Sequence, residues 1–262
     1  MSAYFETLNR RAGAAAQKPA PAPAAERPPA ERPSEPPPPP PQRTLQVLRP
    51  AQVGLRELPK EYGALREKLL VTANGKPLKA LVFAGCGGGE GCTRVVREFA
   101  ETLASSGLNV LLIDADLRTA GLTTSIAAGG ADITELVGHS RSLPATSWGK
   151  GKLTVVPSVA SHPDKERFLR SAEFATWVDA QRSTYDYVLF DTPPLLRFAD
   201  GTLIGRLCDG VVIVAQAEAT EREDLVRTRE QLERAHVRVV GVVLNRDRTW
   251  VPDVLRPYVS TE

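Results

Sequence analysis

The sequence predicts an α/β fold with a doubly wound, mainly parallel sheet, preceded by a disordered, proline-rich N-terminal region. Three observations point to this fold class. Short apolar runs alternate with stretches of helical periodicity between residues 58 and 248, a glycine-rich loop follows the first run, and two later runs end in aspartate. Apolar runs separated by helices are typical of parallel strands with helices on both faces of the sheet. In such sheets ligands bind at the carboxyl ends of the strands.

The composition divides the chain into four segments. Fourteen of the 22 prolines precede residue 60, so this region cannot form part of a packed core. We expect a short helix over residues 1–15, a disordered linker over 16–57, one folded domain over 58–248 and a tail over 249–262. The aromatic stripe of the first segment fits either a fraying terminus or a helix that folds on a partner.

Charge and cysteine content narrow the functional class. The net charge of +2 argues against a nucleic-acid-binding protein. The chain has three cysteines, two of them in the glycine-rich loop, which favours a reducing compartment over a disulfide framework. Residues 1–13 lack the apolar segment of a signal peptide, and the apolar runs are shorter than a membrane span. We therefore expect a cytoplasmic protein that reaches the inner face of the membrane only through a partner.

The alternation of patterns gives six expected strands and five expected helices. The expected strands are the apolar runs at 80–84, 110–113, 153–156, 187–190, 211–215 and 239–244. The expected helices lie at about 59–71, 93–106, 165–182, 200–206 and 222–236.

The glycine-rich loop lies between the first of these strands and the next helix. Residues 84–93 read A-G-C-G-G-G-E-G-C-T. Glycines let a loop turn its N–H groups inward, and the N-terminus of the following helix adds a favourable dipole for an anion. Gly91, Cys92 and Thr93 stand where the P-loop pattern has G-K-[ST]. The hydroxyl that binds Mg²⁺ is thus present, and the lysine that reaches the β/γ-phosphates is replaced.

Two of the expected strands end in a carboxylate. Asp114 closes one apolar run within D-A-D-L-R, which also contains Asp116, and Asp191 closes another at D-T-P-P. Carboxylates at the carboxyl ends of strands beside a P-loop are placed to hold Mg²⁺ or its water ligands. Either aspartate alone would fit a strand-terminating turn. The order of glycine loop and two such strands favours the metal-binding interpretation.

Together these motifs resemble the bacterial tyrosine kinases (BY-kinases), P-loop proteins related to the MinD/ParA ATPases. The three elements match Walker A, Walker A′ and Walker B of that family. Asp200 and the stretches 208–214 and 239–245 add weaker matches. The resemblance implies ATP and Mg²⁺ as cofactors and a membrane polysaccharide co-polymerase (a chain-length determinant protein) as partner, and it leaves a homo-oligomer open.

The resemblance also assigns roles by position. It implies that Mg²⁺ contacts Thr93, Asp114 and Asp191, that Asp114, Asp116 and Asp191 are the catalytic acids, and that Asn245 and Arg246 lie near the adenine. The implied phosphate-binding residues are Gly87, Gly88, Gly89, Glu90, Gly91, Cys92 and Thr93.

Three features depart from the family pattern. Cys92 removes a positive charge, and the loss of one such stabiliser typically costs ~10²–10³ in rate. The tail holds one tyrosine, Tyr258, where the family has a tyrosine cluster, and Glu61 and Arg66 echo the oligomerisation motif at the wrong spacing. The thiol of Cys92 also leaves open a redox role, since a helix N-terminus lowers a thiol pKa.

The leading hypothesis is a pseudokinase that regulates capsular or exopolysaccharide biosynthesis or export. The first alternative is an active tyrosine autokinase or ATPase that uses Arg118 or a cation supplied by a partner. The second is a non-enzymatic adaptor that acts through residues 4–8 and the tail 250–258. A MinD/ParA-like positioning ATPase is less favoured because its signature lysine is missing.

Overall fold

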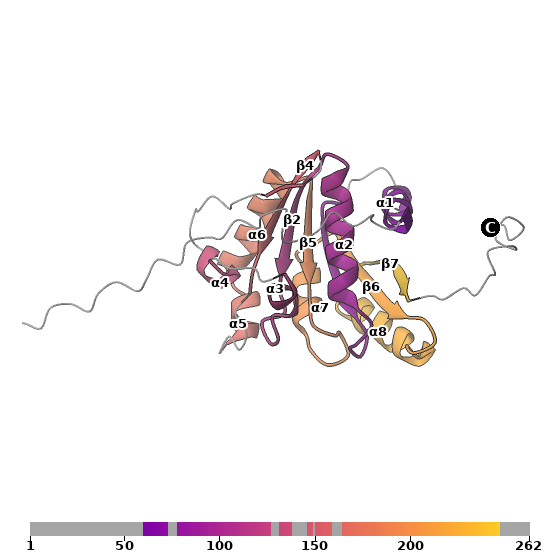
Figure 1. Cartoon of the computed structure of the whole chain (residues 1–262). Helices are drawn as coiled ribbons and strands as arrows, with labels where there is room; N and C mark the ends of the chain where they lie inside the picture. The colour runs from indigo at the N-terminus through magenta and orange to yellow at the C-terminus, as the bar shows by residue number, and fades with distance from the viewer. Residues whose placement is uncertain are drawn as a thin grey trace, which may run out of the picture. The chain divides into compact units, whose positions relative to one another are not determined.

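The computed structural model describes residues 60–72, 78–126, 131–137, 146–148, 150–158 and 164–246 (Figure 1). The expected helix over 1–15, the linker over 16–57 and the tail with Tyr258 lie outside the described residues. Within the described part, no helix has the length and apolar character that crossing a membrane would require.

A seven-stranded sheet forms the centre of the domain, in the order β3-β4-β2-β5-β1-β6-β7. All neighbouring strands pair in parallel except β3, which runs antiparallel to β4 at the edge. The strands are β1 (Ala80–Gly85), β2 (Asn109–Asp114), β3 (Thr146–Trp148), β4 (Gly151–Val156), β5 (Tyr187–Asp191), β6 (Gly210–Gln216) and β7 (Val239–Asn245). All six expected strands are confirmed.

Helices cover both faces of this sheet. On one face α2, with α1 beside it, packs on alternate residues of the central strands, such as Phe83 and Leu112. On the other face α6, α7 and α8 pack on the intervening residues, such as Val82 and Ile113. The helices are α1 (Lys60–Thr72), α2 (Cys92–Ser105), α3 (Gly121–Ser125), α4 (Ile133–Leu136), α5 (Lys165–Leu169), α6 (Ala172–Thr184), α7 (Asp200–Gly205) and α8 (Arg222–Arg234). The doubly wound, mainly parallel fold is therefore confirmed.

The structure differs from the expected elements in one long helix and several short segments. The helix expected over 165–182 is two helices, because Ser171 accepts a hydrogen bond from the Phe174 N–H at 3.1 Å and caps a new helix there. The aromatic rings of Phe168 and Phe174 pack across the break. Strand β3 and helices α3 and α4 were not expected from the sequence, because they have three to five residues each and carry no periodic signal.

Candidate functional site

The glycine-rich loop joins β1 to α2 at the carboxyl end of the sheet. Gly88, Gly89 and Gly91 adopt φ angles of 110°, 94° and 81°, which side chains disfavour. Gly91 is the residue before α2, and no side chain in the described part of the chain caps this helix. The N–H groups of the first turn of an α-helix have no partner within the helix, so this end of α2 is suited to an anion.

Two side chains hold the loop in its conformation through hydrogen bonds, one from the loop itself and one from β7. The buried carboxylate of Glu90 accepts hydrogen bonds from the N–H groups of Gly87 at 2.7 Å and Gly88 at 2.9 Å. The side-chain amide of Asn245, at the end of β7, donates to the Glu90 carbonyl at 2.7 Å. A Cβ atom on Gly91 would lie 2.5 Å from that amide nitrogen, and the φ of 81° also disfavours a side chain, so glycine suits this position. The adenine contact expected for Asn245 stays a prediction.

The two strand-ending aspartates lie side by side. Asp114 of β2 is the register partner of Asp191 of β5, and β5 pairs in turn with β1, which leads into the loop. Asp114 is fully buried and Asp191 is 2% exposed. The parallel strand order thus brings both carboxylates to the edge of the sheet that carries the loop.

Asp114 and Asp116 are already engaged by their own loop. Asp114 accepts hydrogen bonds from the N–H of Thr123 at 2.7 Å, from its hydroxyl at 2.6 Å and from the N–H of Asp116 at 3.1 Å. Asp116 accepts from the N–H groups of Arg118 and Thr119 at 3.0 and 3.1 Å. Both carboxylates therefore fix the segment between β2 and α3.

Asp191 is different, because one of its oxygens is unused. Its Oδ1 is buried and has no hydrogen-bond partner among the described residues. The pKa of this carboxyl is raised to about 7, chiefly by burial; hydrogen bonds from the Thr93 hydroxyl and the Cys92 thiol lower it, and the charges of Asp114 and Asp116 raise it. A buried oxygen without a partner is costly, so Asp191 is the carboxylate that most needs a cation.

The donor set around Asp191 fits a magnesium ion. Mg²⁺ typically takes one or two carboxylates, several waters and the phosphates of a substrate. The described residues contain no group of three or more His, Cys, Asp or Glu side chains that could hold a metal alone. Thr93 and Asp191 would therefore hold Mg²⁺ together with phosphate and water, and Asp114 would stand beside them. These metal roles stay predictions.

The thiol of Cys92 is not in a reactive environment. Burial, followed by the charge of Asp191 and a hydrogen bond to it, raises the pKa of Cys92 well above its ordinary value. The helix N-terminus was expected to lower that pKa, and this expectation was wrong because burial and the carboxylate outweigh the dipole. The thiol stays protonated at neutral pH, which removes the basis for a redox role.

Asp191→Asn is expected to change how stability depends on pH. Since the folded-state pKa of about 7 exceeds the ordinary value of 3.8, the native state keeps a proton that the unfolded chain loses in this window. The free energy of unfolding therefore falls as pH rises from about 4 to 7, by up to about 4 kcal/mol. Asp191→Asn should remove this fall in urea unfolding measured at pH 4 and pH 8.

Asp179→Asn, at an exposed position of α6, is the control and should leave the fall in place. A wild-type stability that is equal at pH 4 and pH 8 would contradict the raised pKa of Asp191.

The segment after Asp191 folds over the start of the glycine loop. The N–H groups of Leu195 and Leu196 each donate at 3.0 Å, to the carbonyls of Gly85 and Cys86. This brings Arg197 beside the loop, where its guanidinium carbon lies 3.7 Å from the position of a Cβ atom on Gly88. Arg197 was not expected at the site, because nothing in the local sequence pattern signals this long-range contact.

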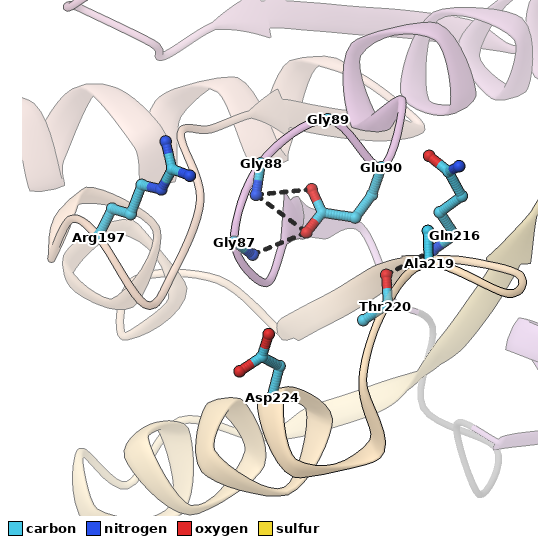
Figure 2. Close-up of a pocket in the computed structure, with 9 residues that line it drawn as sticks. All are labelled: Gly87, Gly88, Gly89, Glu90, Arg197, Gln216, Ala219, Thr220 and Asp224. Carbon is cyan, nitrogen blue, oxygen red and sulfur yellow. Dashed lines mark hydrogen bonds between the residues drawn. The ribbon is translucent and has the colours of Figure 1, made fainter.

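A cavity of about 230 Å³ opens where this segment, the loop and the start of α8 meet (Figure 2). Figure 2 shows Arg197 beside Gly88 on one side and Asp224 facing the loop from α8. The lining residues are Gly87, Gly88, Gly89, Glu90, Arg197, Gln216, Ala219, Thr220 and Asp224.

Arg118, the cation considered in place of the lysine, is held elsewhere. Its Nε and Nη2 donate to the two carboxylate oxygens of Asp200 at 3.2 and 3.0 Å. Its guanidinium also lies 4.0 Å from the centre of the Phe198 ring. Asp200 is fully buried, so Arg118 serves to neutralise it.

Known proteins resemble this chain in sequence and in fold. The family model described as an AAA domain matches residues 78–239. The chain is 30% identical over 197 residues to the tyrosine-protein kinase CpsD of Streptococcus agalactiae. This alignment covers 71% of this chain and 82% of CpsD. It is 29% identical over 187 residues to the succinoglycan biosynthesis transport protein ExoP of Rhizobium meliloti, covering 66% of this chain but 23% of ExoP.

Solved structures similar to this chain include a bacterial tyrosine kinase domain and a MinD ATPase. The kinase domain of the Escherichia coli tyrosine kinase ETK matches with a TM-score of 0.65 and 25% identity, over 73% of this chain and 77% of that one. MinD of Pyrococcus horikoshii, solved with Mg-ADP, matches with a TM-score of 0.54 and 19% identity over 65% and 71% of the two chains, and this likeness concerns the fold alone. The chain therefore belongs to the AAA-domain family of P-loop proteins that includes the bacterial tyrosine kinases.

Proposed function

We propose that this protein is a nucleotide-binding pseudokinase of the bacterial tyrosine kinase group. It regulates the biosynthesis or export of a capsular or extracellular polysaccharide. The proposal rests on what the structure and the sequence show at two neighbouring residues, Asp191 and Cys92. Among the described residues, Oδ1 of Asp191 is buried and has no hydrogen-bond partner, and the P-loop lysine position next to Asp191 holds Cys92.

Different residues would bind the metal ion and the phosphates of the nucleotide. ATP with Mg²⁺ would supply a transferable phosphoryl group. Thr93 and Asp191 would hold the metal, and the uncapped first turn of α2 would hold phosphate oxygens. Phosphoryl transfer develops negative charge that the enzyme must stabilise. The neutral thiol of Cys92 cannot do this, so transfer would be slow while the metal and the first turn of α2 would still hold the nucleotide.

The polysaccharide role rests on the relatives. ExoP is named as a transport protein of succinoglycan biosynthesis, and this chain aligns with 23% of its length. The partner in this proposal is a membrane polysaccharide co-polymerase, which the resemblance to the bacterial tyrosine kinases implies. The protein would act in the cytoplasm at the inner face of the membrane through this partner, as a monomer or a homo-oligomer.

The test of the proposal measures binding and transfer separately. Calorimetric titration of the full chain with MgATP should detect binding. Incubation with MgATP, with and without the cytoplasmic segment of a co-polymerase, should give no phosphotyrosine. Strong phosphotyrosine formation that Asp114→Ala abolishes would overturn the pseudokinase proposal and favour the active autokinase.

A further inference from the structure

A second positive charge stands next to the glycine loop, at Arg197. The guanidinium is 3.7 Å from the position of a Cβ atom on Gly88, both at its carbon and at one terminal nitrogen. Arg197 is exposed, and within the described part of the chain its side chain makes no hydrogen bond or ion pair. It therefore has a charge available for a ligand at the loop.

The other charged groups of this cavity have partners. The carboxylate of Glu90 accepts hydrogen bonds from two loop N–H groups. Asp224, on α8, forms an ion pair with Arg227. Arg197 is thus the charged lining residue whose partner would come from outside the described residues (Figure 2).

The position of Arg197 is fixed by backbone hydrogen bonds. The segment that carries it is joined to the base of the loop at Gly85 and Cys86 by the N–H groups of Leu195 and Leu196, and its own N–H donates to the Pro194 carbonyl at 3.2 Å. Pro194 itself lies 3.2 Å from the position of a Cβ atom on Gly88. This close approach holds the backbone of Arg197 beside the loop and, with the φ of 110°, favours glycine at position 88.

We propose that Arg197 binds the terminal phosphate of a nucleoside triphosphate held on the glycine loop, so that the protein distinguishes a triphosphate from a diphosphate. This inference rests on the proposed function, because it requires nucleotide at the loop. A guanidinium presents several N–H donors and a positive charge to a phosphate. It does so from the segment that follows Asp191 rather than from the loop itself.

The experiment compares affinities rather than activity. Calorimetric titrations of the full chain with MgATP and with MgADP give the ratio of the two affinities. Arg197→Ala should lower the affinity for MgATP about tenfold to a hundredfold, the usual effect of losing hydrogen bonds to a charged group, and change that for MgADP by much less. Arg197→Lys should recover part of the loss, because it keeps the charge but not the planar donor group.

Arg206→Ala is the matched control, since this exposed arginine follows α7 and does not line the cavity. It should leave both affinities unchanged. A ratio that Arg197→Ala changes by less than twofold overturns this inference while nucleotide binding stands. Failure of the unchanged protein to bind either nucleotide overturns both the inference and the proposed function.

Discussion

Cys92→Lys is expected to raise the rate of phosphoryl transfer or ATP hydrolysis by about 10²–10³. The substitution places an ammonium group at the loop, next to the buried carboxylate of Asp191, whose pKa the charges of Asp114 and Asp116 now raise. A positive charge close to a carboxylate favours its ionised form, so the ammonium group should lower the pKa of Asp191. The same charge stabilises the transferring phosphoryl group.

The measurement is ATP turnover and phosphotyrosine formation by the full chain at pH 8. Cys92→Met is the matched control, because it adds a long flexible side chain without a charge, and it should stay as slow as the wild type. The combination of Cys92→Lys with Asp191→Asn should lose the gain. Equal turnover in Cys92→Lys and Cys92→Met would mean that the missing charge is not what limits transfer.

A gain in Cys92→Lys would also bear on Arg197. Two positive charges would then act on the same phosphates, so the loss of MgATP affinity in Arg197→Ala should be smaller in the Cys92→Lys background than in the wild type. Residues that share one ligand are expected to behave non-additively. Additive effects would place the two side chains at separate sites.

The sheet could be predicted because buried parallel strands leave a direct trace in the sequence. Strands buried on both faces read as continuous apolar runs, and all of β1 and most of β6 are buried. Strand β3 has three residues and pairs only at the sheet edge, so it leaves no such run. The break at Ser171 carried a capping signal, but the periodic pattern on both sides of it suggested a single helix.

The site was predictable in its parts but not in its connections. Local motifs indicated the loop and the two strand-ending aspartates, and the parallel strand order puts them together. Local pattern could not show which carboxylate is unsatisfied, because Asp114 is engaged by Thr123 nine residues later. It could not show Arg197 either, whose place depends on hydrogen bonds between segments about 110 residues apart in sequence.

The same limit applies to Arg118. As the last residue of the D-x-D-x-R motif it was a reasonable candidate for a catalytic cation. The structure pairs it with Asp200, 82 residues away, and with the ring of Phe198. The fold uses this arginine to balance a carboxylate that has no exposed surface.

Arg118→Ala is therefore expected to lower the free energy of unfolding by about 3–5 kcal/mol, because it leaves the charge of Asp200 buried without a counter-ion. Urea unfolding of the full chain at pH 7.5 measures this loss. Arg229→Ala, which removes a surface ion pair with Glu233, is the control and should cost about 0–1 kcal/mol. Arg118→Met combined with Asp200→Asn should recover much of the loss, since no unpaired charge is then buried.

Loss of Arg118 should also affect the segment that carries Arg197, and not only the charge of Asp200. Asp200 begins α7 directly after the segment that carries Arg197 and Phe198. Arg118 therefore anchors one end of that segment, and the hydrogen bond from Leu195 to the Gly85 carbonyl anchors the other. Arg118→Ala should therefore also reduce the preference for MgATP over MgADP, although Arg118 does not line the cavity. A loss of stability with an unchanged preference would show that the loop-side hydrogen bonds alone hold Arg197 in place.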